Sequence, residues 1–312
     1  MTQLRNKIDM KKSFYQGNPR LKRTDVQLKL TAHQKRELKR CKQNIQYFIE
    51  NYLKVVHVDH GLVPLELYPY QKKLVEHINN NRYSIVLSCR QSGKTTCTVA
   101  YLLHYSIFNK HKNIGVLANK ASMAQEILDR YKLAYECLPF WLQQGVVTWN
   151  AKDIELENGS KIITGATGGS AARGFSFSCL FLDEAAFVPH NVWQPFFTSI
   201  WPTVSSGQSS KVIMVSTPNG MNHYYEMWMK ANHTDPLKRS EFAPFEVMWT
   251  DVPGRDQAWK QAQINNTDES TFKQEFECIS DKTNIEILHS GKEMETTIGD
   301  LYNKFKQAFN ND

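Results

Sequence analysis

One short stretch, residues 83–96, constrains the fold of this sequence more than any other. An apolar, strand-like run leads into a polar loop that ends in Gly-Lys-Thr, and an apolar, helix-compatible run follows. This order of elements directs backbone N–H groups of a loop and a helix N-terminus at a polyphosphate. We therefore expect Lys94 to reach the outer phosphates and the Thr95 hydroxyl to be a ligand of Mg²⁺. The nucleotide-binding residues predicted in this loop are Ser88, Cys89, Arg90, Gln91, Ser92, Gly93, Lys94, Thr95 and Thr96.

The loop departs from the usual pattern at its first position, where Ser88 stands in place of glycine. A Gly-Lys turn on the protein surface is the alternative interpretation of so short a motif. The strand in front of the loop and an acidic strand further downstream favour the phosphate-binding interpretation.

That downstream strand ends in two adjacent carboxylates, Asp183 and Glu184. Ligands of open α/β sheets bind at the carboxyl ends of the strands. There, Asp183 can hold Mg²⁺ through water and Glu184 can polarise the attacking water. The alternative is an acidic pair that caps a helix. We expect this strand to neighbour the strand before the loop, so that both present their side chains to one magnesium nucleotide.

Two further motifs accompany these. A strand-like run at 211–215 ends in Ser216 and Thr217, whose hydroxyls could sense the γ-phosphate, although the following Pro-Asn-Gly can also be simply a turn. Upstream, Tyr70 and Gln71 could stack on adenine and read its edge, or could mark an ordinary helix start after a proline.

The whole pattern predicts an α/β fold, a P-loop NTPase with a mostly parallel central sheet flanked by helices, plus a small N-terminal helical region. Strand-like runs, the last of them at 246–250, alternate with helical runs. The net charge of +7 permits a nucleic-acid partner without requiring one. The six cysteines show no C-x-x-C spacing, which indicates neither a zinc site nor a disulfide framework. No run is long enough to span a bilayer, so no membrane partner is expected.

Three segments are expected along the chain. Residues 1–58 form a basic, largely helical region, residues 59–277 the P-loop ATPase motor domain, and residues 278–312 a C-terminal tail. Thr31 is predicted to cap the helix of the first segment. The lysines and arginines of that segment either contact nucleic acid or another partner, or form a solvated face.

Together these motifs resemble a known family. The sequences ELYPYQ, SCRQSGKT, CLFLDEAAFVP and MVSTPNG occur in the order and spacing of the ATPase motor of the large terminase subunit of tailed phages, and are most similar to the T4-like group. The resemblance covers about residues 60–278. That family tolerates a residue other than glycine at the first loop position and carries an arginine within the loop.

The resemblance implies a role for each motif. Arg90 would stabilise charge in the transition state, as arginine fingers do, and would form the catalytic set with Lys94 and Glu184. The other implied roles are phosphate and Mg²⁺ binding for Lys94 and Thr95, Mg²⁺ binding for Asp183, coupling for Ser216 and Thr217, and adenine reading for Tyr70 and Gln71.

The resemblance also implies a function. Members hydrolyse ATP with Mg²⁺ to translocate double-stranded DNA into a procapsid. The implied partners are double-stranded DNA, the portal ring, the small terminase subunit and further copies of the chain in a ring on the portal, in the host cytoplasm and transiently on the procapsid portal. A full large terminase continues into a nuclease domain. We expect this chain to lack it, so a separate C-terminal nuclease half is a candidate partner.

Two alternatives to a packaging motor stay open. A helicase-like, nucleic-acid-dependent P-loop ATPase would carry a second motor sheet, for which the sequence gives no pattern. A nucleotide-gated binding subunit without turnover would have little need of the second carboxylate, Glu184.

The tail resembles the N-terminal piece of a split intein. Cys278 is followed by a Thr-x-Ile strand, a hairpin and a Gly-Asp-Leu-Tyr segment. Cys278 would then be a splicing nucleophile that attacks the carbonyl of Glu277. The alternative is a buried structural thiol followed by a divergent or truncated linker.

Overall fold

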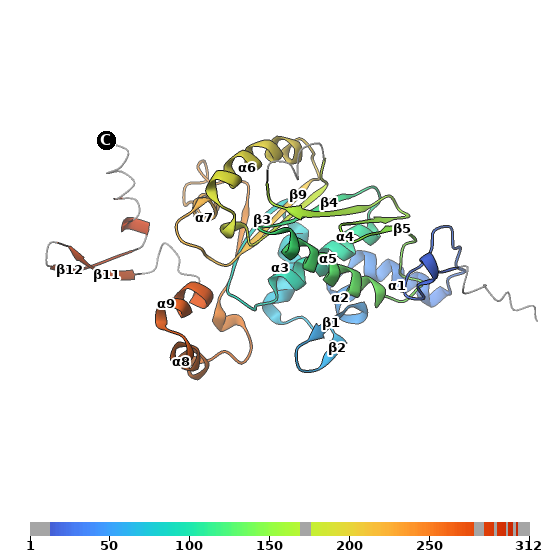
Figure 1. Cartoon of the computed structure of the whole chain (residues 1–312), viewed down its shortest axis with the longest axis horizontal. Coiled ribbons are helices and arrows are strands. Elements are labelled where there is room, and N and C mark those ends of the chain that lie inside the picture. The colour runs from blue at the N-terminus through green and yellow to red at the C-terminus, as the bar shows by residue number, and fades with distance from the viewer. Residues whose placement is uncertain are drawn as a thin grey trace, which may run out of the picture.

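An eight-stranded sheet with the order β10-β3-β9-β8-β4-β7-β6-β5 forms the centre of the computed structural model (Figure 1). The structure describes residues 13–168, 176–277, 284–289, 292–297, 299–301 and 304. The strands of the sheet are β3 (Tyr83–Ser88), β4 (Asn113–Ala118), β5 (Val146–Trp149), β6 (Asp153–Leu156), β7 (Lys161–Ala166), β8 (Cys179–Asp183), β9 (Lys211–Ser216) and β10 (Ala243–Val247).

The sheet is mostly parallel. The strands from β10 to β7 in the sheet order all pair in parallel, whereas β6 and β5 pair antiparallel at one end. This arrangement confirms the predicted α/β fold. Parallel strands are usually covered on both faces and are therefore apolar along their whole length, as the fully buried β3 and β8 are.

Successive residues of the central strands point into two apolar cores, one on each face of the sheet. On β3, Val86 packs in the first core, and Ile85 and Leu87 pack in the second. On β8, Phe181 and Leu182 divide in the same way. This period of two follows from the pleat of a strand, and it requires helices on both faces.

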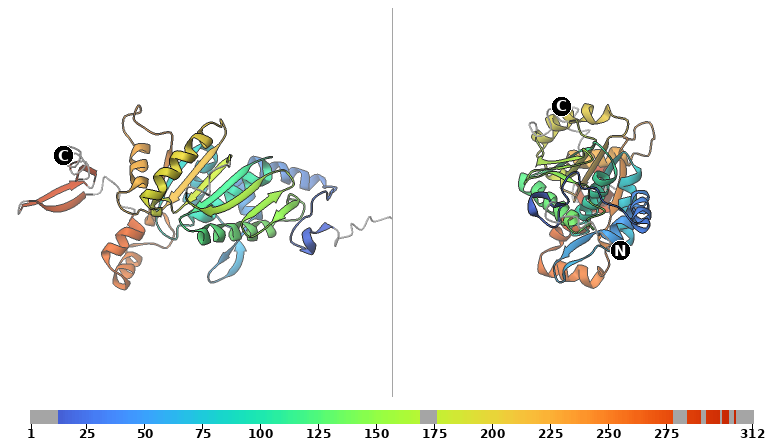
Figure 2. Two further views of the ribbon diagram at one scale, coloured as in Figure 1. Left: turned by 45° about the horizontal axis from the view of Figure 1, so that its top comes forward. Right: turned by 90° about the vertical axis from the view of Figure 1, so that its right-hand side faces the viewer.

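Figure 2 shows those helices on either side of the sheet. The helices that contribute to the first core are α1 (Ala32–Gln43), α2 (Ile45–Tyr52), α3 (Pro69–Asn80), α4 (Lys94–Phe108) and α5 (Ala121–Glu136). Those packed on the second are α6 (His190–Ser205), α7 (His223–Ala231), α8 (Gln257–Asn266) and α9 (Glu269–Phe272). Single-turn elements lie at Tyr15–Gly17, Ala185–Phe187, Trp249–Asp251 and Lys273–Glu277.

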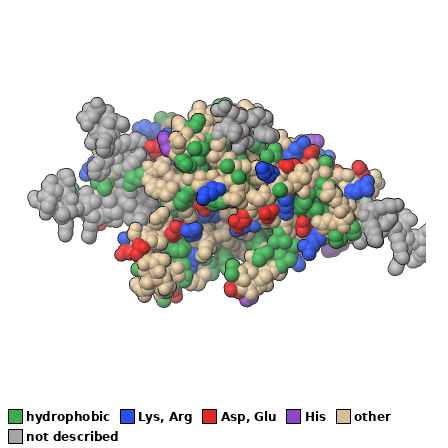
Figure 3. All heavy atoms as spheres, viewed as in Figure 1, with side chains coloured by type: hydrophobic (Ala, Val, Ile, Leu, Met, Phe, Trp, Pro, Cys, Tyr) green, Lys and Arg blue, Asp and Glu red, His purple; other side chains and the backbone are tan. Residues whose placement is uncertain are grey.

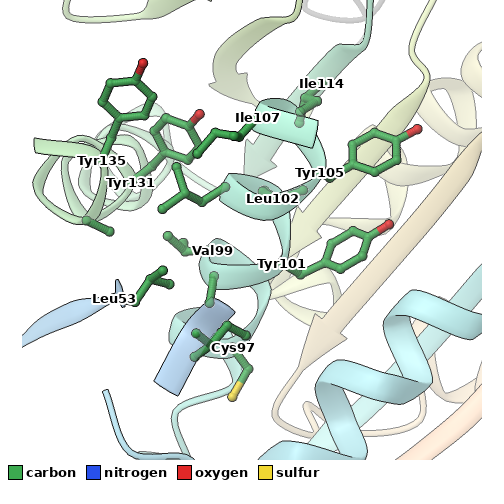
Figure 4. Packing of buried hydrophobic residues seen from close by; sticks show 14 of the residues in the cluster. Leu53, Cys97, Val99, Tyr101, Leu102, Tyr105, Ile107, Ile114, Tyr131 and Tyr135 are labelled. Atoms are coloured by element: carbon green, nitrogen blue, oxygen red, sulfur yellow. The ribbon is translucent and has the colours of Figure 1, made fainter. Parts of the chain in front are cut away.

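Helix α4 is buried on nearly all sides, and this burial fixes the helix that follows the phosphate loop. Figure 4 shows Tyr131 and Tyr135 of α5 on one side of α4, with Tyr101 and Tyr105 extending from its other side. All four rings are buried. The position of the α4 N-terminus is therefore set by the core rather than by the loop alone.

The N-terminal region contains the predicted helix start. The Thr31 hydroxyl accepts from the Gln34 N–H, and the Gln34 side chain accepts from the Thr31 N–H, which is a capping box. The helical run is divided at Asn44, whose side chain caps α2 by accepting from the N–H of Tyr47.

Helices α1 and α2 share the first core with α3, α4 and α5. A hairpin of β1 (Lys54–His57) and β2 (Gly61–Pro64) follows them. The proposed boundary between residues 58 and 59 lies in the turn of this hairpin. The three-segment division stays a prediction.

Two details of the second core differ from simple expectation. Helix α6 contains Pro195 and Pro202, which are typical helix breakers, so this helix was not predicted from the sequence. The strand predicted at 246–250 is β10, which begins earlier and ends at Val247. Pro244 is tolerated in β10 because this strand lies at the edge of the sheet.

The hairpin predicted in the tail is confirmed. β11 (Asn284–His289) and β12 (Lys292–Thr297) pair antiparallel, and Figure 1 draws them apart from the central sheet. The proposed nucleophile Cys278 lies outside the described residues.

Gly115 in β4 provides a test of this packing. A Cβ added at Gly115 would lie 2.8 Å from a ring carbon of Phe177. Because overpacking a dense core forces neighbours to shift, we expect Gly115→Ala to lower the free energy of unfolding by about 1–3 kcal/mol, measured by urea titration. The double variant Gly115→Ala/Phe177→Leu should recover part of the loss, since Leu is shorter. Wild-type stability of Gly115→Ala would contradict the packing.

Candidate functional site

The phosphate loop, residues 89–93, joins the carboxyl end of β3 to the N-terminus of α4. The acidic pair lies at the carboxyl end of β8. The expectation that β3 and β8 are neighbours was wrong, because β9 lies between them and ends in Ser216 and Thr217. The side chains still converge, since parallel strands all end at the same edge of the sheet.

The backbone of the loop adopts a left-handed conformation at two residues. Gln91 has φ +56° and Gly93 has φ +78°. Such angles are uncommon for a residue with a side chain. Glycine is required at position 93 for a second reason, because a Cβ there would lie 2.6 Å from Nε2 of Gln71.

Tyr70 and Gln71 contact the phosphate loop directly. The Tyr70 hydroxyl and the Gln71 amide donate to the carbonyl oxygen of Ser92 at 2.7 and 3.0 Å. The Gln71 Oε1 accepts from the N–H of Tyr68 at 3.0 Å. Both side chains are buried. In this conformation they support the loop, and their contact with adenine stays a prediction.

Ser88, which replaces the usual glycine, has a local partner. Its hydroxyl is hydrogen-bonded to the hydroxyl of Ser92, and both residues are buried. A serine at this position therefore ties the last residue of β3 to the fourth residue of the loop.

The site brings its predicted cation and anions together. Lys94 Nζ lies 2.9 Å from Glu184 Oε1, with side chains that are only 8% and 19% exposed. The Thr95 hydroxyl donates to Asp183 at 3.3 Å. Thr96 lies one residue further along α4 and lines a separate cavity of about 430 Å³ beneath the β1–β2 hairpin.

The predicted coupling residues contact Glu184. Its Oε2 accepts from the Ser216 hydroxyl at 3.3 Å, the Thr217 N–H at 3.2 Å and the Thr217 hydroxyl at 3.5 Å. Glu184 itself has φ +50°. The end of β9 thus holds the carboxylate that pairs with Lys94, and the coupling role of Ser216 and Thr217 stays a prediction.

Asp183 is held in an environment that disfavours its charge. Burial, and then the adjacent charge of Glu184, raise the pKa of Asp183 to about 6, while Lys94 and Thr95 act in the opposite direction. A nearby divalent cation would remove this penalty.

The oxygen donors of Thr95 and Asp183 suit Mg²⁺, which usually takes one or two protein oxygens together with substrate phosphates and water. Among the described residues, no group of three or more His, Cys, Asp or Glu side chains could hold a metal ion. The donors present therefore fit an ion that arrives with a nucleotide.

Two contacts on the outer side of the loop were not predicted from the sequence. Arg90 Nη1 pairs with Glu275 at 2.9 Å, and the Arg90 N–H donates to the Glu275 carbonyl oxygen at 2.9 Å. Arg255 donates to the carbonyl oxygens of Arg90 and Gln91. These partners lie more than 150 residues downstream of the loop, and no motif marks them.

The site thus combines a loop between a strand and a helix, a lysine at the start of that helix, two adjacent carboxylates and two hydroxyls. This combination is typical of P-loop nucleotide-binding domains. Comparison with known proteins defines the family. The sequence model described as "Terminase large subunit, T4likevirus-type, N-terminal" matches residues 85–289, well over half of the chain. The chain belongs to this family and carries the ATPase domain of a phage large terminase subunit.

Solved structures agree with this fold. The large terminase ATPase domain of Thermus phage P74-26 aligns with a TM-score of 0.56 and 19% identity, over 68% of this chain and 92% of that one. The HK97 bacteriophage large terminase aligns with a TM-score of 0.63 and 16% identity, over 78% of this chain and 56% of that one. A large terminase from a thermophilic bacteriophage, in complex with ADP, aligns with a TM-score of 0.51 and 14% identity, over 68% and 52%. This chain thus spans little more than half of the two longer proteins.

The family match confirms the resemblance stated from the motifs. It also continues to residue 289, past Cys278. No comparison supports the split-intein interpretation of the tail.

The raised pKa of Asp183 predicts how stability depends on pH. Folding shifts this pKa from 3.8 to about 6, so the folded state loses stability as the pH rises through that window. A shift of about two units corresponds to at most about 3 kcal/mol. We expect Asp183→Asn, without nucleotide or metal, to raise the free energy of unfolding at pH 7.5 and to do so less at pH 5.

The control for this test is Asp129→Asn, since that carboxylate is largely exposed on α5. Its effect should stay within about 0.5 kcal/mol at both pH values. Urea unfolding in EDTA measures both variants. A destabilised Asp183→Asn at pH 7.5 would show that the charge of Asp183 is favourable in the free protein.

Proposed function

We propose that this chain is an ATPase motor that hydrolyses ATP with Mg²⁺ and drives double-stranded DNA into a procapsid. The observation that supports it most directly is the 2.9 Å pair of Lys94 and Glu184 at the end of a phosphate loop. This pair places a cation that can bind phosphate next to a carboxylate that can accept a proton.

The site residues then act in sequence. When a polyphosphate enters, Lys94 exchanges the Glu184 carboxylate for phosphate oxygens. Glu184, held by Ser216 and Thr217, is then free to orient and accept a proton from the attacking water. Mg²⁺, held by Thr95 and Asp183, would neutralise charge on the phosphate oxygens.

Arg90 can take the catalytic role proposed for it only if it leaves its present partner. Its guanidinium is paired with Glu275, so it must leave that carboxylate to stabilise charge on the transferred phosphoryl group. Such a charge-stabilising arginine is a common part of P-loop NTPases. We also propose that Tyr70 stacks on adenine and that Gln71 reads its edge, which requires both side chains to leave the carbonyl oxygen of Ser92.

The partners proposed are double-stranded DNA, the portal ring, the small terminase subunit and other copies in a ring, together with a separate nuclease half. The proposed location is the host cytoplasm and, transiently, the procapsid portal. No helix in the described part of the chain has the length and apolar character to cross a membrane. On the face drawn in Figure 3, basic and acidic side chains are interspersed and form no continuous basic patch.

Other functions have less support. The described residues form one large sheet and two hairpins, whereas a helicase-like ATPase has a second motor sheet.

The split-intein proposal for the tail depends on Cys278. Co-expression with a candidate downstream fragment should give a ligated product that Cys278→Ala abolishes.

Glu184→Gln separates a motor from a binding subunit. We expect ATP hydrolysis to fall by about 10²–10⁴-fold, because the amide cannot accept the proton, in a phosphate-release assay. MgATP binding, measured by calorimetry, should survive or tighten, since Lys94 loses its competing carboxylate. Unchanged hydrolysis would refute the role assigned to Glu184.

Lys94→Ala tests the other half of the pair. We expect both MgATP binding and hydrolysis to be lost, because the phosphates lose their charged ligand and Glu184 is left as an unpaired carboxylate beside them. Lys110→Ala, which changes a lysine beyond the end of α4, is the control and should match the wild type. Wild-type nucleotide affinity of Lys94→Ala would contradict the proposed site.

A further inference from the structure

Arg255 contacts three consecutive residues of the phosphate loop from the outside. Its Nη1 donates to the Arg90 carbonyl oxygen at 3.1 Å and lies 3.6 Å from the Cys89 sulfur. Its Nη2 donates to the Gln91 carbonyl oxygen at 3.2 Å. We propose that Arg255 is a positioning residue that fixes the peptide groups on both sides of Gln91 for phosphate binding. The inference rests on the proposed nucleotide binding.

The two carbonyl contacts determine the direction of two N–H groups. In a trans peptide the C=O and N–H bonds point in opposite directions. The carbonyls of Arg90 and Gln91 point at Arg255, so the N–H groups of Gln91 and Ser92 point to the opposite side of each peptide. These are N–H groups of the loop expected to meet the phosphates.

The same contacts hold a backbone conformation that is otherwise unfavourable. Gln91, between the two bonded carbonyls, has φ +56°. A residue with a side chain keeps such a conformation only when its surroundings over-determine it. Arg255 supplies that restraint, because one planar guanidinium bonds both flanking peptides at once.

Arg255 is itself held by aromatic rings. Its guanidinium lies 4.7 Å from the ring centre of Trp259 and 5.5 Å from that of Phe276. Trp259 packs in turn against Trp249 and Phe272. Among the described residues, no carboxylate lies within 4.0 Å of the Arg255 side-chain nitrogens in an ion pair. The guanidinium is therefore directed at the loop rather than at an acidic partner.

The experiment measures MgADP affinity by calorimetry and ATP hydrolysis at steady state. In Arg255→Ala we expect the Kd of MgADP and the KM of ATP to rise by about tenfold, with kcat lowered less than about threefold, because loop N–H groups bind ground state and transition state alike. Arg255→Lys keeps the charge but cannot bond both carbonyls well, so its Kd should be intermediate.

A rescue variant distinguishes positioning from general stability. Gln91→Gly makes the left-handed conformation accessible without restraint. The Kd increase caused by Arg255→Ala should therefore be smaller in the Gln91→Gly background than in the wild-type background. The matched control is Arg239→Ala, which removes another arginine that donates to a main-chain carbonyl, that of His233 at 2.9 Å. Its Kd should stay within about twofold of the wild type.

The outcomes separate this inference from the proposed function. If the wild type fails to bind MgADP, the proposed function and this inference both fall. If the wild type binds and Arg255→Ala binds equally well, only the inference is overturned. An equal Kd increase in both backgrounds also overturns it, because the effect would then not pass through the conformation of Gln91.

Discussion

The ion pair of Lys94 and Glu184 is the contact on which the site depends. It joins the helix that follows the phosphate loop to the end of β8, across the intervening strand β9. Both side chains are largely buried, and a buried charge without a partner is energetically costly. The pair holds the two side chains in place against each other. Under the proposed function, a phosphate would take the position of Glu184 beside Lys94, so that substrate binding and release of the carboxylate would be one exchange.

The phosphate loop is held by two different sets of contacts, one on each side. On the inner side, Tyr70 and Gln71 stand at the start of α3, which packs in the first core with α4. On the outer side, Arg255 and Glu275 belong to the chain that follows β10. The inner contacts join the loop to a dense core, which resists deformation. The outer contacts come from two arginines, one paired with a carboxylate and the other bonded to main-chain carbonyl oxygens of the loop.

The central chemistry could be predicted from sequence because it is local. The Gly-Lys-Thr ending, the acidic pair and the polar tip of β9 each follow an apolar run that is buried on both faces, and such runs are visible without a structure. The order of strands was not visible, since β9 enters between β3 and β8 through pairing of residues distant in sequence. Arg255 was missed for the same reason. Helix α6 was missed because its buried Trp193 and Phe196 are interrupted by prolines that a packed helix can tolerate.

The position of β3 in the sheet affects when this part of the chain can fold during synthesis. β3 lies between β9 and β10, whose residues begin at Lys211 and Ala243. During synthesis, this strand gains its lateral partners only after residues 211–216 and 243–247 have been made. Pairings so distant in sequence form slowly. A nascent chain therefore carries Lys94 well before the strands on either side of β3 have been made.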